Sequence, residues 1–337
     1  SADCEYHASL DPYLFSLGAT VRKGVEPTIV EKALFAEITR LQETPASPEE
    51  MAMAIRQTEA HFAYSSESVT SHALTLGFAE MVDSVSRLDT VLEALRKVTP
   101  DDVMRVSQEY LSPARRTVGW YIPDEASTPA TAGGLVAEMS VRRRFWALSD
   151  DSQGLAGSPV IRETLDNGIT VLLQRRDTSA AVAIGGRVPF GTFLDDPDKP
   201  GITYLTSSML RRGTRGRSFQ EINGALDHVG AALSVATGRD ELSIGGRCLG
   251  GDLNTVISLL GEMLREPSFD ERELERLRGQ ILTHMEELER DTSYRANLAF
   301  IESLYTSEHP YGRPLMGQAE SISNLSAEDL RALYRRH

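Results

Sequence analysis

The amino-acid sequence predicts an α+β fold of two lobes joined by a long linker, and three observations predict it. Stretches with apolar residues at helical spacing alternate with short segments typical of strands. A stretch rich in Pro, Ala, Thr, Ser and Gly over 123–134 is typical of a linker. Two similar helix-start signals, which indicate a shared plan, lie on either side of it: Thr99-Pro100-Asp101-Asp102 and Ser326-Ala327-Glu328-Asp329.

The first lobe is predicted over 1–123, with strand and turn over 11–24 followed by helices. Apolar residues such as Ile29 and Ala33 fall on one face of a helix over 26–43. Ser47-Pro48-Glu49-Glu50 matches a capping box and predicts the start of the next helix. Further elements are expected as helices over 68–83 and 99–111 and as a strand over 116–122.

The second lobe is predicted over 160–337, after a linker over 124–159. Asn167-Gly168 between apolar segments predicts a hairpin with a type I′ turn. Asp252 is expected to cap a helix that carries Val256 and Leu260 on one stripe. The remaining elements are expected as strands over 180–188, 231–237 and 241–248, and as helices over 201–212, 219–229, 270–305 and from Ser326.

Composition restricts the class of protein and of partner. The chain has 337 residues, of which 41% are hydrophobic and 25% charged, a balance typical of globular domains. Its net charge of −14 predicts repulsion from phosphate backbones, so no nucleic-acid partner is expected. No stretch approaches the roughly 18 consecutive apolar residues of a membrane-spanning helix, so no span is predicted.

The second lobe also carries a sequential pattern of motifs. The pattern comprises the Asn167-Gly168 hairpin, the strand and turn over 187–195, the stretch from Gly201 to Thr214, and His309-Pro310-Tyr311-Gly312. It resembles the insulinase/pitrilysin family of zinc metallopeptidases, which includes the mitochondrial processing peptidase. The resemblance implies lobes like those of that peptidase, each an antiparallel sheet with helices packed on one face.

The first lobe shares this resemblance more loosely. Asp11-Pro12-Tyr13-Leu14-Phe15, Leu76-Gly77 and the Thr99 cap are similar to the C-terminal lobe of a preceding half in the same family. We therefore expect the chain to be an internal segment of a longer polypeptide. Its second lobe is expected to be the N-terminal type of lobe of a second peptidase half.

The family's active site is an H-x-x-E-H motif on a helix, completed by a Glu on a later helix. Two imidazoles at i and i+4 share a face and can bind one zinc ion, while the Glu between them activates water. The stretch from Gly201 to Thr214 sets the register. The two His positions fall on Tyr204 and Ser208, the Glu position on Ser207, and the third ligand position near His284.

All four positions differ from the motif. The resemblance therefore implies a non-catalytic, pseudo-peptidase portion with no catalytic, cofactor-binding or metal-binding residue of its own. Zinc is expected in the active half of the parent protein, which we expect to be a zinc metalloendopeptidase. The expected partners are that other peptidase half, in the same polypeptide or a partner subunit, and a peptide substrate; together the halves form the substrate chamber.

Other interpretations stay open at the level of sequence. The chain could instead be a non-enzymatic scaffold or peptide-binding protein on the same fold, or an enzyme of unrelated chemistry. A serine-hydrolase interpretation of Ser207 and Ser208 with Asp227 and His228 is disfavoured, because no G-x-S-x-G elbow surrounds either serine. A bacterial periplasm or cytoplasm is expected, with the periplasm favoured.

The two cysteines, Cys4 and Cys248, give no further direction. Two are too few for a zinc ribbon or a disulfide framework. Cys4-x-x-His7 has the spacing of a metal-ligand pair, but no second pair lies near it. We therefore expect a structural or incidental role for Cys4 and His7, and packing for Cys248.

Overall fold

The computed structural model describes residues 2–6, 9–21, 24–65, 69–122, 159–175, 179–306 and 309–337. The chain forms two compact units, the first being Ser1–Gln108 with Ser179–His337 and the second Glu109–Thr178. Nearly all of the linker predicted over 124–159 lies outside the described residues. The predicted lobe boundaries therefore stay a prediction.

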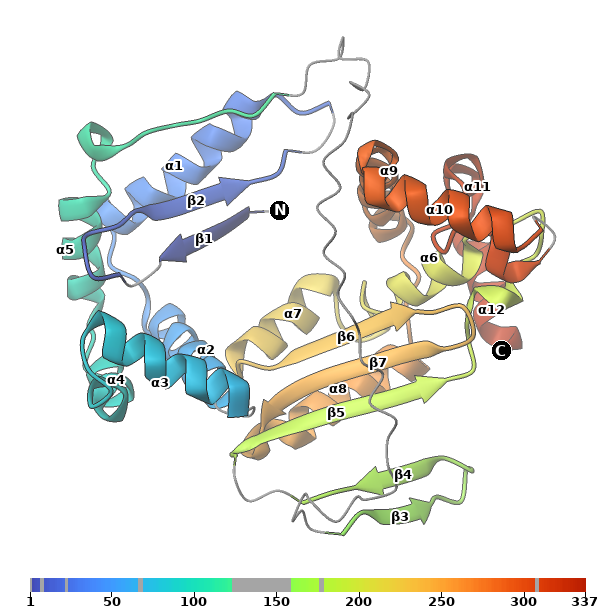
Figure 1. The fold of residues 1–337 in the computed structure, drawn as a ribbon, viewed down its shortest axis with the longest axis horizontal. Helices are drawn as coiled ribbons and strands as arrows, with labels where there is room; N and C mark the ends of the chain where they lie inside the picture. Colours follow the sequence, from blue (N-terminus) through green and yellow to red (C-terminus); the bar gives the residue numbers. More distant parts are fainter. Residues whose placement is uncertain are drawn as a thin grey trace. The chain divides into compact units, whose positions relative to one another are not determined.

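The N-terminal part of the larger unit is a β-hairpin followed by helices (Figure 1). Strands β1 and β2 pair antiparallel, with Cys4 opposite Leu17. The predicted capping boxes form: the Glu50 amide donates to Ser47 Oγ at 3.2 Å, and the Asp102 amide donates to Thr99 Oγ1 at 3.2 Å. The elements are β1 (Ala2–Tyr6), β2 (Phe15–Ala19), α1 (Pro27–Glu43), α2 (Pro48–Ser65), α3 (Val69–Val82), α4 (Arg87–Leu95) and α5 (Pro100–Tyr110).

The smaller unit contains one hairpin, made of β3 (Ile161–Thr164) and β4 (Thr170–Leu173). The predicted type I′ turn is wrong, because that turn needs positive φ at both central residues and only Gly168 has it, at 85°. The Gly168 amide donates to Leu165 O at 2.8 Å, and the Leu165 amide donates to Ile169 O at 2.9 Å. This is the pattern of a type I turn followed by a glycine bulge.

The strand predicted over 116–122 is also wrong. These residues follow a 3₁₀ turn (Pro113–Arg115), and none of them is assigned to a strand. They are exposed. An alternating pattern forms a strand only where another strand pairs with it, and no strand of the described ranges is aligned with 116–122.

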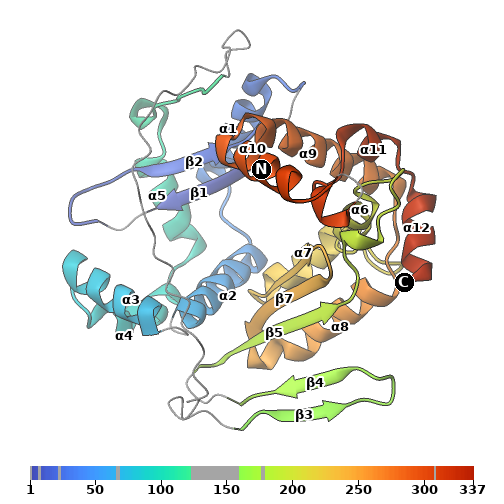
Figure 2. The same ribbon diagram turned by 45° about the vertical axis from the view of Figure 1, so that its right-hand side comes forward.

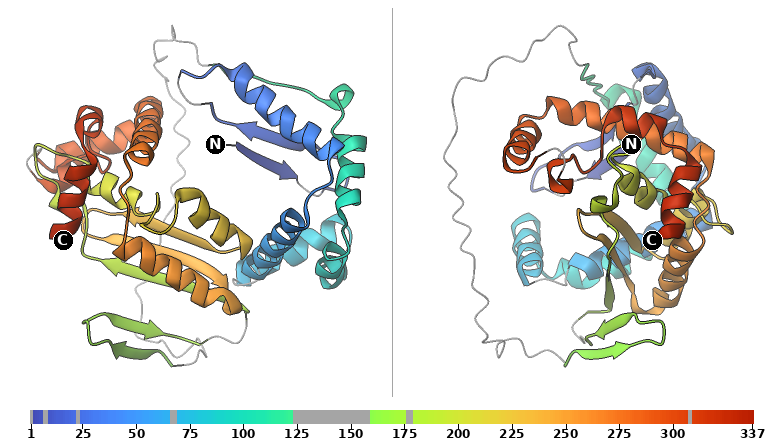
Figure 3. Two further views of the ribbon diagram at one scale, coloured as in Figure 1. Left: turned by 180° about the vertical axis from the view of Figure 1, so that it is seen from behind. Right: turned by 90° about the vertical axis from the view of Figure 1, so that its right-hand side faces the viewer.

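The C-terminal part of the larger unit is built on a three-stranded antiparallel sheet in the order β5-β7-β6. Its elements are β5 (Ala181–Val188), β6 (Ala232–Thr237), β7 (Leu242–Leu249), α7 (Phe219–His228) and α8 (Leu253–Arg265). Helices α7 and α8 cover one face of the sheet, as Figure 3 shows from behind. Leu233 and Cys248 of the sheet meet Ile222 of α7 and Val256 of α8 there.

A second core cluster forms around α6 (Ile202–Met209), which contacts β6 and also α9 and α12 (Figures 1 and 2). Leu205 and Met209 of α6, Leu274 of α9 and Leu330 of α12 are all 1% exposed or less. The other elements are α9 (Glu271–Arg290), α10 (Thr292–Leu304), α11 (Ala319–Asn324) and α12 (Ala327–Arg336). The predicted fold class, helices packed on antiparallel sheets, is confirmed.

The prediction that the Asp252 side chain caps a helix is wrong. Asp252 stands at the N-cap position of α8, but its side chain accepts no hydrogen bond from the helix. Its carboxylate lies 2.6 Å from Arg56 Nη2 of α2. An ion pair with a residue distant in sequence has replaced the local cap. The other predicted cap in this part, Ser326, forms its capping box with Asp329.

Candidate functional site

The start of α6 is fixed by a buried carboxylate. Asp195 accepts hydrogen bonds from the amides of Gly201, at 2.6 Å, and Thr203, at 2.9 Å. Burial raises the pKa of the Asp195 carboxyl, and these hydrogen bonds oppose the rise. Asp195 thus satisfies two amides that have no partner within the helix.

The backbone conformation and the surroundings of residue 201 require a glycine. Its φ is 94°, and a Cβ at this position would lie 2.5 Å from the carbonyl oxygen of Met316. A residue with a side chain would meet both backbone strain and a clash. The glycine that opens the motif therefore has a structural role that does not depend on any metal.

Three of the four positions that correspond to the zinc motif lie in α6. Ser207 is 1% exposed, and its hydroxyl donates to the carbonyl oxygen of Thr203 at 2.8 Å. The Ser208 hydroxyl donates to Tyr204 O at 2.8 Å. Both serines thus bond back to their own helix, as mid-helix hydroxyls commonly do. Tyr204 is partly buried against the core around α6, and burial raises the pKa of its phenol.

The fourth position, His284, lies in α9. Its side chain is 55% exposed, and Nδ1 lies 3.4 Å from Glu287 Oε2 on the next turn. Helices α6 and α9 contact each other, so the structure brings together the two helices that the resemblance requires. The assignment of Tyr204, Ser207, Ser208 and His284 to the motif positions stays a prediction.

The residues at these positions do not fit zinc. Protein zinc sites use Cys thiolates, His nitrogens and Asp or Glu oxygens. Of the four residues only His284 offers such a donor, and the serine hydroxyls are engaged with backbone carbonyls. Elsewhere in the described ranges, no group of three or more His, Cys, Asp and Glu side chains could hold a metal ion.

The other predicted candidates do not assemble into a site. Asp227 and His228 are exposed at the end of α7, whereas the hydroxyls of Ser207 and Ser208 point back into their own helix. Cys248 is fully buried, and burial raises the pKa of its thiol, as expected of a packing residue. Cys4 is exposed, and its possible partner His7 lies outside the described residues.

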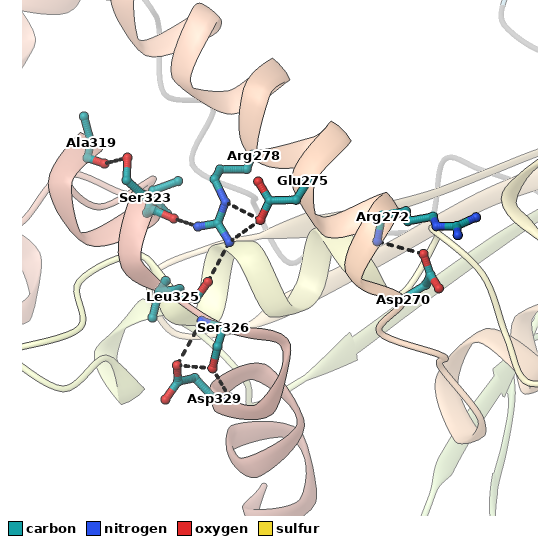
Figure 4. A network of polar contacts seen from close by, with 10 residues as sticks. Asp270, Arg272, Glu275, Arg278, Ala319, Ser323, Leu325, Ser326 and Asp329 are labelled. Atoms are coloured by element: carbon teal, nitrogen blue, oxygen red, sulfur yellow. Dashed lines mark hydrogen bonds and ion pairs between the residues drawn. The ribbon is translucent and has the colours of Figure 1, made fainter.

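Sequence reasoning missed Arg278, which is central to the polar network in Figure 4. This α9 residue is 9% exposed; its guanidinium donates to the carbonyl oxygens of Ile322 and Leu325 and pairs with Glu275 at 3.1 Å. It thereby fixes α9 to the C-terminal end of α11. A signal was present in the sequence, because Arg278 shares the helical stripe of the buried residues Leu274 and Ile281.

Within the described residues, no helix combines the length and the apolar composition needed to cross a lipid bilayer.

The comparison with protein families addresses the motif region directly. Residues 170–319 match the family model described as Insulinase (Peptidase family M16). This stretch is similar to the insulinase family. The resemblance predicted from Gly201 to Thr214 is confirmed, and the matched range also contains His284.

Curated proteins are similar to about half or more of the chain. The chain is 23% identical over 174 residues to a probable mitochondrial-processing peptidase subunit beta of Arabidopsis thaliana, covering 52% of this chain and 33% of the relative. It is 26% identical over 178 residues to an uncharacterized zinc protease of Streptomyces coelicolor, covering 53% and 39%. It is 24% identical over 226 residues to the human mitochondrial-processing peptidase subunit beta, covering 60% and 46%. The chain thus spans less than half the length of these relatives.

Solved structures are also similar to parts of the chain. One is a peptidase M16 inactive domain from Pseudomonas fluorescens, with a TM-score of 0.49 and 24% identity over 52% of this chain and 43% of that one. Another is the periplasmic protease PqqL from Escherichia coli, with a TM-score of 0.48 and 18% identity over 54% of this chain and 21% of that one.

Proposed function

We propose that this chain is a non-catalytic portion of an insulinase-family zinc metallopeptidase. It helps to form the chamber around a peptide substrate, while zinc binding and hydrolysis belong to another peptidase half. One observation carries the proposal. The framework that positions α6 is complete, yet the positions of the zinc motif hold Tyr204, Ser207, Ser208 and His284.

The framework on both sides of α6 supports this. Before the helix, Gly201 and Asp195 make the close approach and the two amide bonds described above. After it, Gly213 has φ of 138°, and Thr214 Oγ1 accepts hydrogen bonds from the amides of Gly216, at 3.3 Å, and Arg217, at 3.0 Å. The lobe keeps the features that set its shape, so the changed positions affect metal chemistry rather than folding.

The proposal implies particular partners. The other peptidase half, in the same polypeptide or in a separate subunit, supplies the zinc site, and the shared ligand is a peptide. The names of two relatives, zinc protease and mitochondrial-processing peptidase, support a zinc peptidase as the parent protein. We also propose a bacterial periplasmic location, which fractionation of the native host would test.

The first experiment measures zinc per chain by atomic emission after exhaustive dialysis, together with peptide hydrolysis by the chain alone. We expect a zinc content near zero and no chelator-sensitive hydrolysis. About one zinc ion per chain would overturn the proposal, and His284, His228 and Cys248 would then be the first residues to replace. The alternative, a non-enzymatic peptide-binding scaffold, predicts that the full-length parent protein also binds peptide without cleaving it.

A further inference from the structure

Arg211 is a cation with no counter-charge in the part of the chain that the structure describes. It comes directly after the C-cap residue of α6, Leu210, and its side chain is partly buried. Within the described ranges it makes no hydrogen bond or ion pair. Burial lowers the pKa of its guanidinium. A charged group taken out of water without a partner costs free energy, so this position is one where an anion would stabilise the protein.

The charges of Arg211 and Arg276 both act on a third guanidinium group, that of Arg212. The Arg212 side chain is 16% exposed, lies over the Phe219 ring at 4.7 Å from its centroid, and donates to Gln280 Oε1 of α9. Burial lowers the pKa of its guanidinium; the charge of Glu273 opposes this, and the charges of Arg211 and Arg276 lower the pKa further. The ring and the amide hold Arg212 in place without neutralising it.

The Glu273 carboxylate lies near two of these cations, Arg276 and Arg212. Glu273 lies 2.7 Å from Arg276 Nη1 and 3.9 Å from Arg212 Nη1. The positive excess is local, in a chain whose net charge is −14. The dipole of α6 favours a cation at its C-terminal end. This would explain one exposed arginine there, but it does not explain why both Arg211 and Arg212 are partly buried.

The cluster lies close to the positions of the lost metal motif. In the sequence, Arg212 comes about one helical turn after Ser208. Its hydrogen-bond partner in α9, Gln280, comes about one turn before His284. We propose that Arg211, Arg212 and Arg276 form a binding site for a carboxylate of a peptide. Guanidinium groups match carboxylate oxygens in charge and in paired hydrogen-bond geometry. The choice of a peptide as the ligand rests on the proposed function.

The test uses fluorescence anisotropy with the full chain and two labelled peptides of equal length, one of glutamates and one of lysines. We expect the glutamate peptide to bind, the lysine peptide not to bind, and binding to weaken as salt is raised. Arg211→Gln should weaken binding roughly tenfold, the size expected for a charge-assisted hydrogen bond. Arg335→Gln, at an exposed position in the last turn of α12, is the matched control and should leave the affinity unchanged.

Arg276→Gln provides a second variant in case Arg211→Gln fails to fold, because its side chain is 60% exposed. Equal binding of both peptides, or unchanged affinity in the Arg211 and Arg276 variants, would overturn the inference. If the chain binds inorganic phosphate but does not bind the glutamate peptide, the assignment of a peptide as the ligand is overturned. Zinc is measured on the same preparations. If the chain is free of zinc and does not bind the glutamate peptide, only the proposed carboxylate site is refuted. If the chain contains bound zinc, the proposed function is refuted.

Discussion

The guanidinium group of Arg278 in α9 donates a hydrogen bond of 2.7 Å to the carbonyl oxygen of Leu325, 47 positions later in the chain. Leu325 is the C-cap residue of α11, and carbonyl groups at a helix end have no partner within the helix. Arg278 supplies the missing donor from a neighbouring helix. It thereby holds in place the helix that carries His284.

Replacing Arg278 should therefore be costly. Arg278→Met keeps most of the side-chain volume but leaves two buried carbonyls without a donor, so we expect the free energy of unfolding to fall by about 2–4 kcal/mol. Arg272→Met, at an exposed position on the same helix, should change it by less than about 0.5 kcal/mol. Urea unfolding measures both, and equal effects would contradict the role given to Arg278.

Gly201→Ala should destabilise the protein strongly. The added Cβ would lie 2.5 Å from Met316 O, at a φ of 94° that residues with side chains rarely adopt. Gly224→Ala in α7 is the control, since nothing lies within 4 Å of its Cβ position. There we expect a gain of about 0.5–1 kcal/mol from higher helix propensity. The melting temperatures of the two variants are compared with that of the unsubstituted chain. An unchanged melting temperature in Gly201→Ala would contradict the role given to this glycine.

Thr206→Val should stabilise the protein. Thr206 is fully buried in α6, and its hydroxyl has no hydrogen-bond partner among the described residues. Removing a buried polar group without a partner should raise the free energy of unfolding by about 1 kcal/mol. Thr283→Val in α9 is the control, because its hydroxyl donates to Gly279 O at 2.9 Å. Denaturant titration should show a gain only for Thr206→Val; a loss there would indicate that the hydroxyl has a partner.

Asp329 should give the stability a defined acid dependence. A hydrogen bond from Lys199, followed by bonds from Ser326, lowers the pKa of Asp329 from 3.8 to about 2. The folded form therefore binds fewer protons than the unfolded form in this range. The contribution, about 2 kcal/mol, is complete above roughly pH 4 and is lost as the pH falls toward 2.

The measurement compares the unsubstituted chain with the Asp329→Asn variant by urea unfolding between pH 2 and pH 7. The difference between them should shrink as the pH falls. Lys199→Gln should reduce this pH dependence, because it removes the largest cause of the lowered pKa. A difference that stays constant with pH would refute the assignment.

Restoring the metal ligands tests the positions assigned to the motif. The triple variant Tyr204→His, Ser208→His and His284→Glu would place two imidazoles one turn apart on α6 and a carboxylate on α9, the family's ligand set. We expect it to bind zinc at about one ion per chain, measured by atomic emission with circular dichroism as the folding control. The double variant that keeps His284 should bind zinc more weakly. A folded triple variant without zinc would show that the register is wrong.

Local signals in the sequence were sufficient for much of the fold and for the location of the candidate site. Ser47, Thr99 and Ser326 predicted helix starts because a capping box uses only residues three positions apart. Gly201 to Thr214 predicted the family segment for a similar reason, since the register of one helix is local. The hairpin at Gly168 was predicted, but its turn type was wrong, because the turn's hydrogen bonds to Leu165 and Ile169 depend on the whole loop.

The sequence by itself determined which residue types stand at the four positions assigned to the motif, and that only one of them, His284, is a usual zinc ligand. Only the tertiary structure decided that Asp252 pairs with Arg56 and does not cap its helix, and that Arg278 bridges α9 to Leu325. It also decided that Arg211 has no counter-charge among the described residues. The physical reason is the range of the interactions. Helix caps and periodicity act within a few residues, whereas ion pairs, burial and unmet charge depend on segments that only folding brings together.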